Sequence, residues 1–186
     1  MKRIVLTFGL ISGAIMAAMM VLTLPFMEKI GFDKAMVIGY TTMVLAFLLL
    51  FFGIRSYRDT IGNGRISFGR AVGVGLLIVA VAGACYVATW EILSYKFIPD
   101  FADKCEAHAI EGIRNSGKPP AEIAQEIEKT KEMMTLYKNN LLFNMAITFL
   151  EPLPVGVLMT LISALILRKR APKPEPLATG LPHLQN

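Results

Sequence analysis

Four long apolar runs constrain the fold of this chain more than any other feature. The first three, residues 4–24, 35–54 and 71–90, contain no charged side chain, and the fourth, residues 141–167, contains only Glu151. A helix that crosses the hydrocarbon core of a bilayer needs about 20 mostly apolar residues. The first run is too long for the apolar part of a signal peptide, so we expect it to be retained.

The composition supports the same class of protein. The chain is 54% hydrophobic and only 18% charged, which is too apolar for an ordinary soluble domain of 186 residues. The predicted fold class is therefore all-α, a polytopic membrane protein with four transmembrane helices. The net charge of +5 could indicate nucleic-acid binding, but the basic residues are distributed along the chain and form no basic helix or arm. We expect no nucleic-acid partner.

A loop of unusual charge separates the second run from the third. It holds one acid, Asp59, and four arginines that form a predicted topology anchor: Arg55, Arg58, Arg65 and Arg70. Short loops rich in arginine and lysine stay on the cytoplasmic side of a membrane. Four spans then place both termini in the cytoplasm. Further basic residues near the ends of the first and last runs agree with this orientation: Lys2, Arg3, Arg168, Lys169, Arg170 and Lys173.

The same loop contains a predicted tight turn. Gly62, Asn63 and Gly64 accept a backbone with positive φ, and Ser67 is a suitable N-cap for the next helix. A glycine-rich loop with arginines could also hold a phosphate or a lipid headgroup, although it lacks the lysine spacing of a P-loop. We interpret the loop as a topology anchor and a turn, with anion binding as the alternative.

Residues 91–140 form the only long polar region, and its acidic residues outnumber its basic ones. A proline-containing break at residues 115–120 precedes positions spaced by three or four residues, which is one face of a helix: Ile123, Ile127, Thr130, Met134 and Tyr137. We predict an extracytoplasmic helical hairpin between the third and fourth spans, about residues 91–140, with the third helix continuing outward and kinked at Pro99. The proline-rich end, residues 171–186, is predicted to be a disordered cytoplasmic tail, which leaves residues 1–170 as one transmembrane domain.

Glu151 is the most unusual residue of the apolar runs. It is followed by Pro152 and Pro154, which cannot donate helical hydrogen bonds, so we predict a kink in the fourth span. Residues at a comparable predicted depth complete a candidate intramembrane polar site: Glu151, Glu91, Thr148, Asn144, Tyr86 and Tyr40. Glu151 is either a proton-exchanging group or a protonated hydrogen-bond partner that holds the kink, and we favour the structural role.

Small residues and possible ligands complete the survey. Gly9 and Gly13 give the first helix a thin face for close packing, and Gly69 and Gly73 repeat the spacing of four. Cys85 and Cys105 are too far apart for an internal disulfide, so Cys105 is a semi-buried thiol or, less plausibly, an intermolecular link.

His108 is surrounded by acidic residues in the sequence, which suggests a metal site. A single histidine on a charged helix is more often solvated, so we expect no metal. The sequence also shows no Ser-His-Asp set, Cys-His pair or nucleotide-binding loop. We predict no catalytic residues, no cofactor and no enzyme activity.

Several segments together resemble a known family: GIRSYRD, GNGRISFGRA, CYVATWEI, AITFLEPLPVG and LISALILRK. They are similar to the bacterial four-helix membrane proteins of domain-of-unknown-function family 4199, over the whole chain except its tail. The resemblance implies an integral protein of a bacterial inner membrane and assigns no activity.

Two functional hypotheses follow. The first is a non-enzymatic structural or interaction protein of the lipid bilayer that binds itself or a membrane protein partner through the hairpin and the small-residue faces. The alternative is a small oligomeric proton-coupled transporter that uses Glu151.

Overall fold

The structure, a computed structural model, describes residues 1–169; the tail predicted to be disordered, residues 171–186, lies outside them. The described chain is helical, and no strand occurs within it. Its elements are, in chain order, α1 (Lys2–Thr23), η1 (Leu24–Phe26), α2 (Met27–Ile30), α3 (Phe32–Thr60), α4 (Phe68–Lys96), α5 (Phe101–Arg114), α6 (Pro120–Asn139), α7 (Leu141–Leu150) and α8 (Leu153–Leu167).

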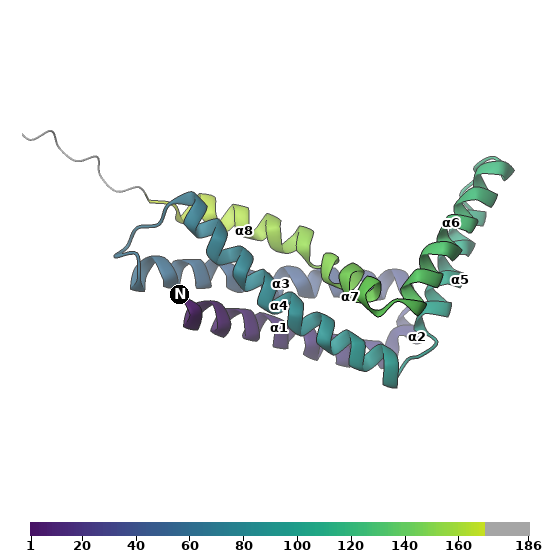
Figure 1. Cartoon of the computed structure of the whole chain (residues 1–186), viewed down its shortest axis with the longest axis horizontal. Helices are drawn as coiled ribbons and strands as arrows, with labels where there is room; N and C mark the ends of the chain where they lie inside the picture. Colours follow the sequence, from purple (N-terminus) through teal and green to yellow (C-terminus); the bar gives the residue numbers. More distant parts are fainter. Residues whose placement is uncertain (170–186) are drawn as a thin grey trace, which may run out of the picture.

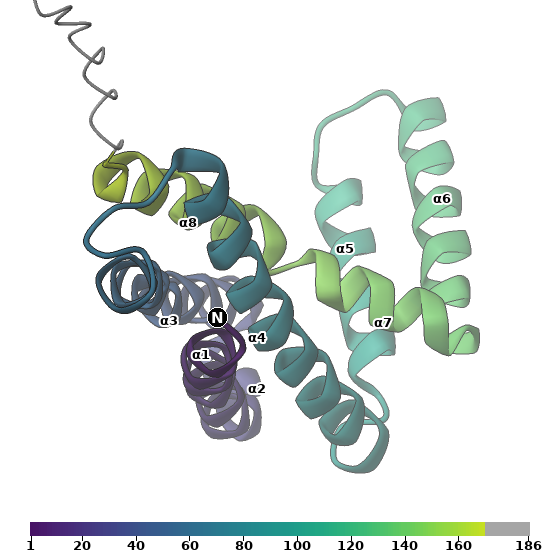
Figure 2. The same ribbon diagram turned by 60° about the vertical axis from the view of Figure 1, so that its left-hand side comes forward.

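The prediction of four spans is confirmed. Four helical stretches are long and apolar enough to cross a membrane: Lys2–Thr23, Asp33–Thr60, Phe68–Lys96 and Leu141–Leu167. They lie side by side as a bundle (Figures 1 and 2). The N-terminus, the α3–α4 loop and the end of α8 share one end of the bundle, which we call the loop end. Helices α5 and α6 project from the opposite end, the hairpin end.

The α3–α4 loop has the predicted turn and cap. Asn63 and Gly64 adopt positive φ, 48° and 78°, and the Ser67 side chain accepts a hydrogen bond of 3.4 Å from the Arg70 backbone N–H. The backbone N–H of Lys169, just after α8, donates to the Ile66 carbonyl at 3.0 Å. This bond joins the loop to the end of the last span. The sequence alone does not predict this contact.

Pro99 ends the third span instead of kinking it. We predicted a continuous helix, but α4 ends at Lys96 and α5 begins at Phe101 in a different direction (Figure 1). Pro99 has no N–H to donate to the Tyr95 carbonyl, and it disfavours helical backbone at Ile98. The two effects together terminate the helix and free α5 to pair with α6.

The hairpin itself has the predicted amphipathic face. Along α6 the five residues of that face are all partly shielded, whereas most other positions of the helix are exposed. Helix α5 packs against α6, and neither contains a fully buried residue. The hairpin is therefore a two-helix unit held by one shared seam.

Glycines bring the helices close together, as predicted for α1. A Cβ atom at Gly9 would lie 2.6 Å from the Cβ of Val81, and one at Gly13 would lie 2.6 Å from the Cβ of Cys85. These distances leave room only for glycine, so α1 and α4 approach at their backbones. The Ser12 hydroxyl also donates to the Ala46 carbonyl at 3.1 Å, which links α1 to α3.

The tightest packing lies toward the loop end. Helices α3, α4 and α8 meet there, and a Cβ at Gly75 of α4 would lie 2.5 Å from the Thr160 methyl carbon of α8. We call this region the packed half; its central side chains are fully buried or nearly so: Phe47, Leu50, Ile54, Val74, Ile78, Thr160 and Ala164. Gly69 and Gly73, which share the spacing of Gly9 and Gly13, have no neighbouring atom within 4 Å of a built Cβ.

Candidate intramembrane ligand site

The fourth span is interrupted at Glu151, as predicted. Helix α7 ends at Leu150, α8 begins at Leu153, and Pro152 between them is buried. The Glu151 N–H still donates to the Ile147 carbonyl at 3.2 Å, but a proline follows and the regular hydrogen-bond ladder stops. The break places the Glu151 side chain where it can leave the helix surface.

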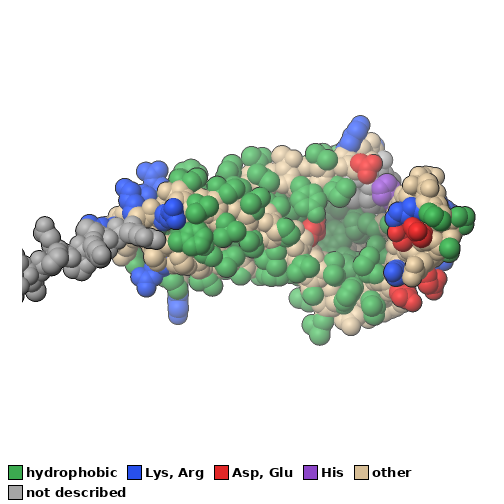
Figure 3. All heavy atoms as spheres, turned by 90° about the horizontal axis from the view of Figure 1, so that it is seen from above, with side chains coloured by type: hydrophobic (Ala, Val, Ile, Leu, Met, Phe, Trp, Pro, Cys, Tyr) green, Lys and Arg blue, Asp and Glu red, His purple; other side chains and the backbone are tan. Residues whose placement is uncertain are grey.

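A cavity of about 390 Å³ lies on the hairpin side of this break. Parts of α1, α3, α4 and α7 form its sides, and the base of the hairpin contributes Phe101, Cys105 and Tyr137. Figure 3 shows the hollow between the bundle and the hairpin, with mainly hydrophobic side chains around it. We call this region the cavity half. The volume falls in the range of small-molecule sites, about 300–1,000 Å³.

Methionines form much of the cavity wall: Met16, Met19, Met20, Met36 and Met43. The methionine side chain is unbranched and flexible, and its sulfur is polarisable, so it adapts to apolar partners of irregular shape. The wall therefore suits an apolar group without fixing one shape for it.

Polar atoms gather at one part of this wall. The Tyr86 hydroxyl donates to Glu151 Oε2 at 2.9 Å, which joins α4 to the break in the fourth span. No hydrogen bond of Glu151 Oε1 occurs in the part of the chain that the structure describes, and the residue is exposed. One carboxyl oxygen is therefore held by the protein while the other is available to a ligand.

A second polar network closes the cavity at the hairpin end. The indole N–H of Trp90 donates to the Tyr137 hydroxyl at 2.8 Å, and the Trp90 ring meets Phe101 edge-on with centroids 4.7 Å apart. Asn144 accepts a hydrogen bond from the Thr148 hydroxyl at 3.3 Å and donates to the Tyr137 carbonyl at 3.3 Å. Burial raises the pKa of Tyr137, and the bond from Trp90 opposes this only in part. Its hydroxyl is therefore neutral near pH 7 and acts as a hydrogen-bond partner.

The predicted polar site is divided by the fold. Glu151, Tyr86 and Thr148 lie on the cavity wall, and Asn144 bonds Thr148. Tyr40 is 42% exposed and is not part of the wall. Glu91 also lies outside the wall, and its Oε1 is buried without a hydrogen-bond partner among the described residues.

Sequence reasoning missed the methionines, Trp90 and Tyr137 as wall residues. A signal was present, because Met16, Met19, Met20 and Thr23 are spaced as one face of a helix. A second such face is formed by Met36, Gly39 and Met43. Taken alone, each face is equally typical of ordinary helix packing.

The remaining candidate ligands stay apart. Cys85 and Cys105 are free thiols, and burial raises the pKa of Cys105 to about 11. The Cys105 thiol is therefore protonated near pH 7. His108 Nε2 lies 3.6 Å from Asp33 Oδ1, between the hairpin and the start of α3. Within residues 1–169 no cluster of three or more His, Cys, Asp or Glu side chains could hold a metal ion.

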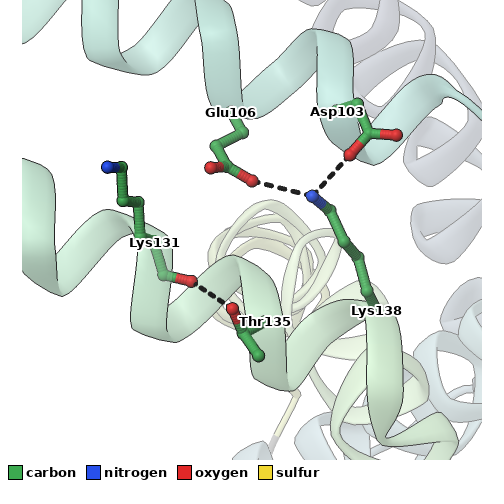
Figure 4. Close-up of polar contacts among 5 residues, drawn as sticks. All are labelled: Asp103, Glu106, Lys131, Thr135 and Lys138. Carbon is green, nitrogen blue, oxygen red and sulfur yellow. Dashed lines mark hydrogen bonds and ion pairs between the residues drawn. The ribbon is translucent and has the colours of Figure 1, made fainter.

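Ion pairs hold the hairpin together away from the cavity (Figure 4). Lys138 Nζ of α6 donates to Asp103 Oδ1 at 2.5 Å and to Glu106 Oε2 at 2.7 Å, both on α5. These carboxylates raise the pKa of Lys138. Lys and Arg side chains gather at the loop end in Figure 3, whereas the acidic side chains in this view lie toward the hairpin.

This architecture identifies the class of protein. The described chain is helical, and four of its helical stretches are long and apolar enough to cross a membrane, as in a multi-pass membrane protein. The family model described as "Protein of unknown function (DUF4199)" matches residues 7–169, and the chain belongs to this family. The resemblance seen in the sequence is thereby confirmed. Neither the curated proteins nor the solved structures contain a match to the chain.

Proposed function

We propose that this chain is a non-enzymatic integral protein of a bacterial inner membrane that binds an amphiphile in the cavity half. The observation that carries the proposal is a carboxyl group, Glu151, bonded by Tyr86 on the wall of a mainly apolar cavity. The apolar part of the ligand lies among the methionines, and its polar group bonds the second oxygen of Glu151.

The position of the cavity supports an amphiphile over a water-soluble ligand. Its walls belong mainly to helices that are long and apolar enough to cross a membrane, so a ligand reaches it from the lipid phase. Binding sites of this kind combine an apolar lining with a few convergent polar groups that fix orientation.

The proposed orientation has both termini and the arginine loop in the cytoplasm and the hairpin outside. It is supported by the basic residues at the loop end. In a variant with Asn63→Cys as the only cysteine, labelling from outside intact cells should be absent. With Ala121→Cys, on the exposed surface of α6, labelling should be strong. The opposite pattern would invert the orientation.

Proton-coupled transport by an oligomer is the second candidate, because Glu151 faces a cavity instead of being enclosed by packed helices. Four helices alone enclose little pathway, so several copies would be needed. The exposed hairpin offers a surface for another copy or a membrane protein partner. The glycines of α1 offer no such surface, because they already contact α4.

The chain provides its own probe for ligand binding. Trp90 is the only tryptophan, and it lies on the cavity wall. A brominated monoacylglycerol, whose hydroxyl groups can donate to Glu151, is added to the full chain in a detergent without bromine and should quench the Trp90 fluorescence saturably. Glu151→Leu removes the polar anchor and should weaken binding about tenfold, because one hydrogen bond to a charged or buried group is worth about 1.5 kcal/mol. Tyr95→Phe, at an 86% exposed tyrosine of the same helix as Tyr86, is the control and should change nothing.

The same quenching titration, combined with a measurement of proton flux, distinguishes amphiphile binding from proton-coupled transport. Glu151→Gln keeps the shape and most hydrogen bonds, so amphiphile binding should remain close to that of the unchanged protein. If the residue must exchange a proton, Glu151→Gln should abolish proton flux in liposomes while Glu151→Asp retains some. Quenching that rises linearly and is indifferent to Glu151→Leu would refute the binding proposal.

A further inference from the structure

A second cavity, of about 330 Å³, lies at the loop end and has the opposite chemistry. It lies between the α3–α4 loop and the end of α8, and three cationic side chains line it: Arg65, Arg70 and Lys169. No acidic residue among residues 1–169 lines it. We call it the basic pocket.

The three cations are not neutralised by any residue that the structure describes. The one acid of the loop, Asp59, is already paired with Arg58 at 2.7 Å and Arg55 at 3.6 Å. Arg65, Arg70 and Lys169 form no ion pair within residues 1–169. The pocket therefore carries an excess of positive charge that an anion would balance.

Two further features of the wall suit an anion with oxygen atoms. Tyr57 is only 6% exposed and lines the pocket, yet its hydroxyl has no hydrogen bond among the described residues. Ser67, the N-cap of α4, and Arg70 in its first turn also line the pocket, and a helix N-terminus carries a partial positive charge. The hydroxyl of a mostly buried tyrosine, a helix N-terminus and three cations converge on one space.

The topology of the chain alone does not explain this arrangement. The rule for cytoplasmic loops depends on the number of basic residues and requires no pocket. Here the backbone bond from Lys169 to Ile66, 3.0 Å long, brings a cation from the end of the last span to the loop between two earlier spans. The convergence of distant residues is what distinguishes a site from a charged loop.

We propose that the basic pocket binds the phosphate group of an anionic phospholipid. Basic pockets between transmembrane helices on the cytoplasmic side suit such headgroups. The pocket lies at the ends of three apolar spans, and apolar side chains beside it, Ile61 and Phe68, are 46% and 39% exposed. They provide a surface for the upper part of the acyl chains, which a free phosphate would not use.

The test is native mass spectrometry of the full chain in a neutral detergent, with phosphatidylglycerol, phosphatidylcholine or inorganic phosphate added. Phosphatidylglycerol should bind saturably, one molecule per chain, and more tightly than phosphatidylcholine. Arg65→Gln with Lys169→Gln should weaken this binding roughly 30-fold, since each charge near a lipid headgroup accounts for about a fivefold change. Tyr57→Phe removes no charge and should weaken it about tenfold.

The matched control is Lys2→Gln with Arg3→Gln, which removes the same charge from the same end of the bundle but outside the pocket. This control should change phosphatidylglycerol binding less than twofold. A loss as large as that of Arg65→Gln with Lys169→Gln would show a general attraction between the basic end of the bundle and anionic lipid, and would overturn the proposal. Arg65→Lys with Lys169→Arg keeps the charge and should stay within about threefold, which separates lost binding from a folding defect. Full competition by inorganic phosphate would assign the pocket to free phosphate and contradict a lipid site. Phosphatidylcholine binding as tight as that of phosphatidylglycerol would contradict a preference for anionic lipid.

Discussion

The packed half and the cavity half of the bundle consist of the same kind of helix but differ in how completely side chains fill the space between the helices. In the packed half, bulky residues such as Phe47 and Leu50 are fully buried, and Gly75 lets α4 approach α8. In the cavity half, methionines leave about 390 Å³ unfilled. Lipid is as apolar as these helices, so association inside a membrane depends on close packing and not on removal from water. The comparison teaches that the packed half holds the bundle together, which allows the other half to keep a space for a ligand.

The largest expected effect comes from emptying the packed half. Phe47→Ala removes a side chain that is 0% exposed and should lower the free energy of unfolding by about 3–5 kcal/mol. The control is Phe52→Ala on the same helix, where the ring is 52% exposed, and it should cost less than about 1 kcal/mol. Unfolding titrations in mixed micelles measure both. Equal losses would mean that Phe47 does not lie in a packed core.

Crowding the packed half is the next test. A Cβ at Gly75 would meet three Thr160 atoms within 3.1 Å, so Gly75→Ala should destabilise the protein by about 1–3 kcal/mol. Gly73 lies two residues away with no neighbour within 4 Å, and Gly73→Ala should be neutral or stabilising by up to about 1 kcal/mol. The comparison of melting temperatures is decisive, because both changes add one methyl group to the same helix.

Filling the cavity half should have a smaller effect on stability and a larger one on binding. Met20→Phe places a ring against open space and should change the free energy of unfolding by less than about 1 kcal/mol, while reducing quenching by the brominated monoacylglycerol. Leu50→Phe introduces the same ring where the side chain is 0% exposed, and should cost about 1–3 kcal/mol. A Met20→Phe protein as unstable as Leu50→Phe would show that the cavity closes in solution.

The last test concerns Cys105 at the cavity wall, where the effect is on reactivity and not on binding. Its pKa of about 11 leaves little thiolate at pH 8, so in a Cys85→Ala protein maleimide should react roughly 100-fold more slowly than at an ordinary thiol. The rate should rise as the pH approaches 11. In a cysteine-free background, Ala107→Cys on the exposed surface of α5 supplies the ordinary rate.

The same raised pKa has a consequence for stability. The folded state keeps the Cys105 proton at a pH where the unfolded chain has lost it, so stability should fall as the pH rises from about 9 to about 11. Cys105→Ser, whose hydroxyl does not titrate in this range, should remove this part of the pH dependence. A Cys105 that reacts as fast as Ala107→Cys at pH 8 would contradict a buried, protonated thiol.

Features set by neighbouring residues were predictable from the sequence. Four spans, the turn at Asn63 and Gly64, the cap at Ser67 and the break at Glu151 each follow from a run, a spacing or a proline within one segment. Pro99 shows the limit of this approach. The same chemistry that kinks a packed helix ends a helix that has no neighbour to hold its continuation.

Features set by contacts between segments were not predictable. Gly69 and Gly73 have the same spacing as Gly9 and Gly13, yet only Gly9 and Gly13 meet another helix. Tyr40 was placed in the polar site by its depth, but depth does not tell which way a helix faces. Both cavities depend on residues brought together from distant parts of the chain, and the sequence gives no rotation or register for them.

The bond between Lys169 and Ile66 has a consequence for the order of assembly. During synthesis the α3–α4 loop leaves the ribosome long before the end of α8, because the chain is made from its N-terminus onward. The loop can complete its turn early, but its partner arrives only after the last span has been made. The basic pocket therefore cannot exist in a nascent chain with three helices. Its formation marks the moment at which the fourth helix has taken its place.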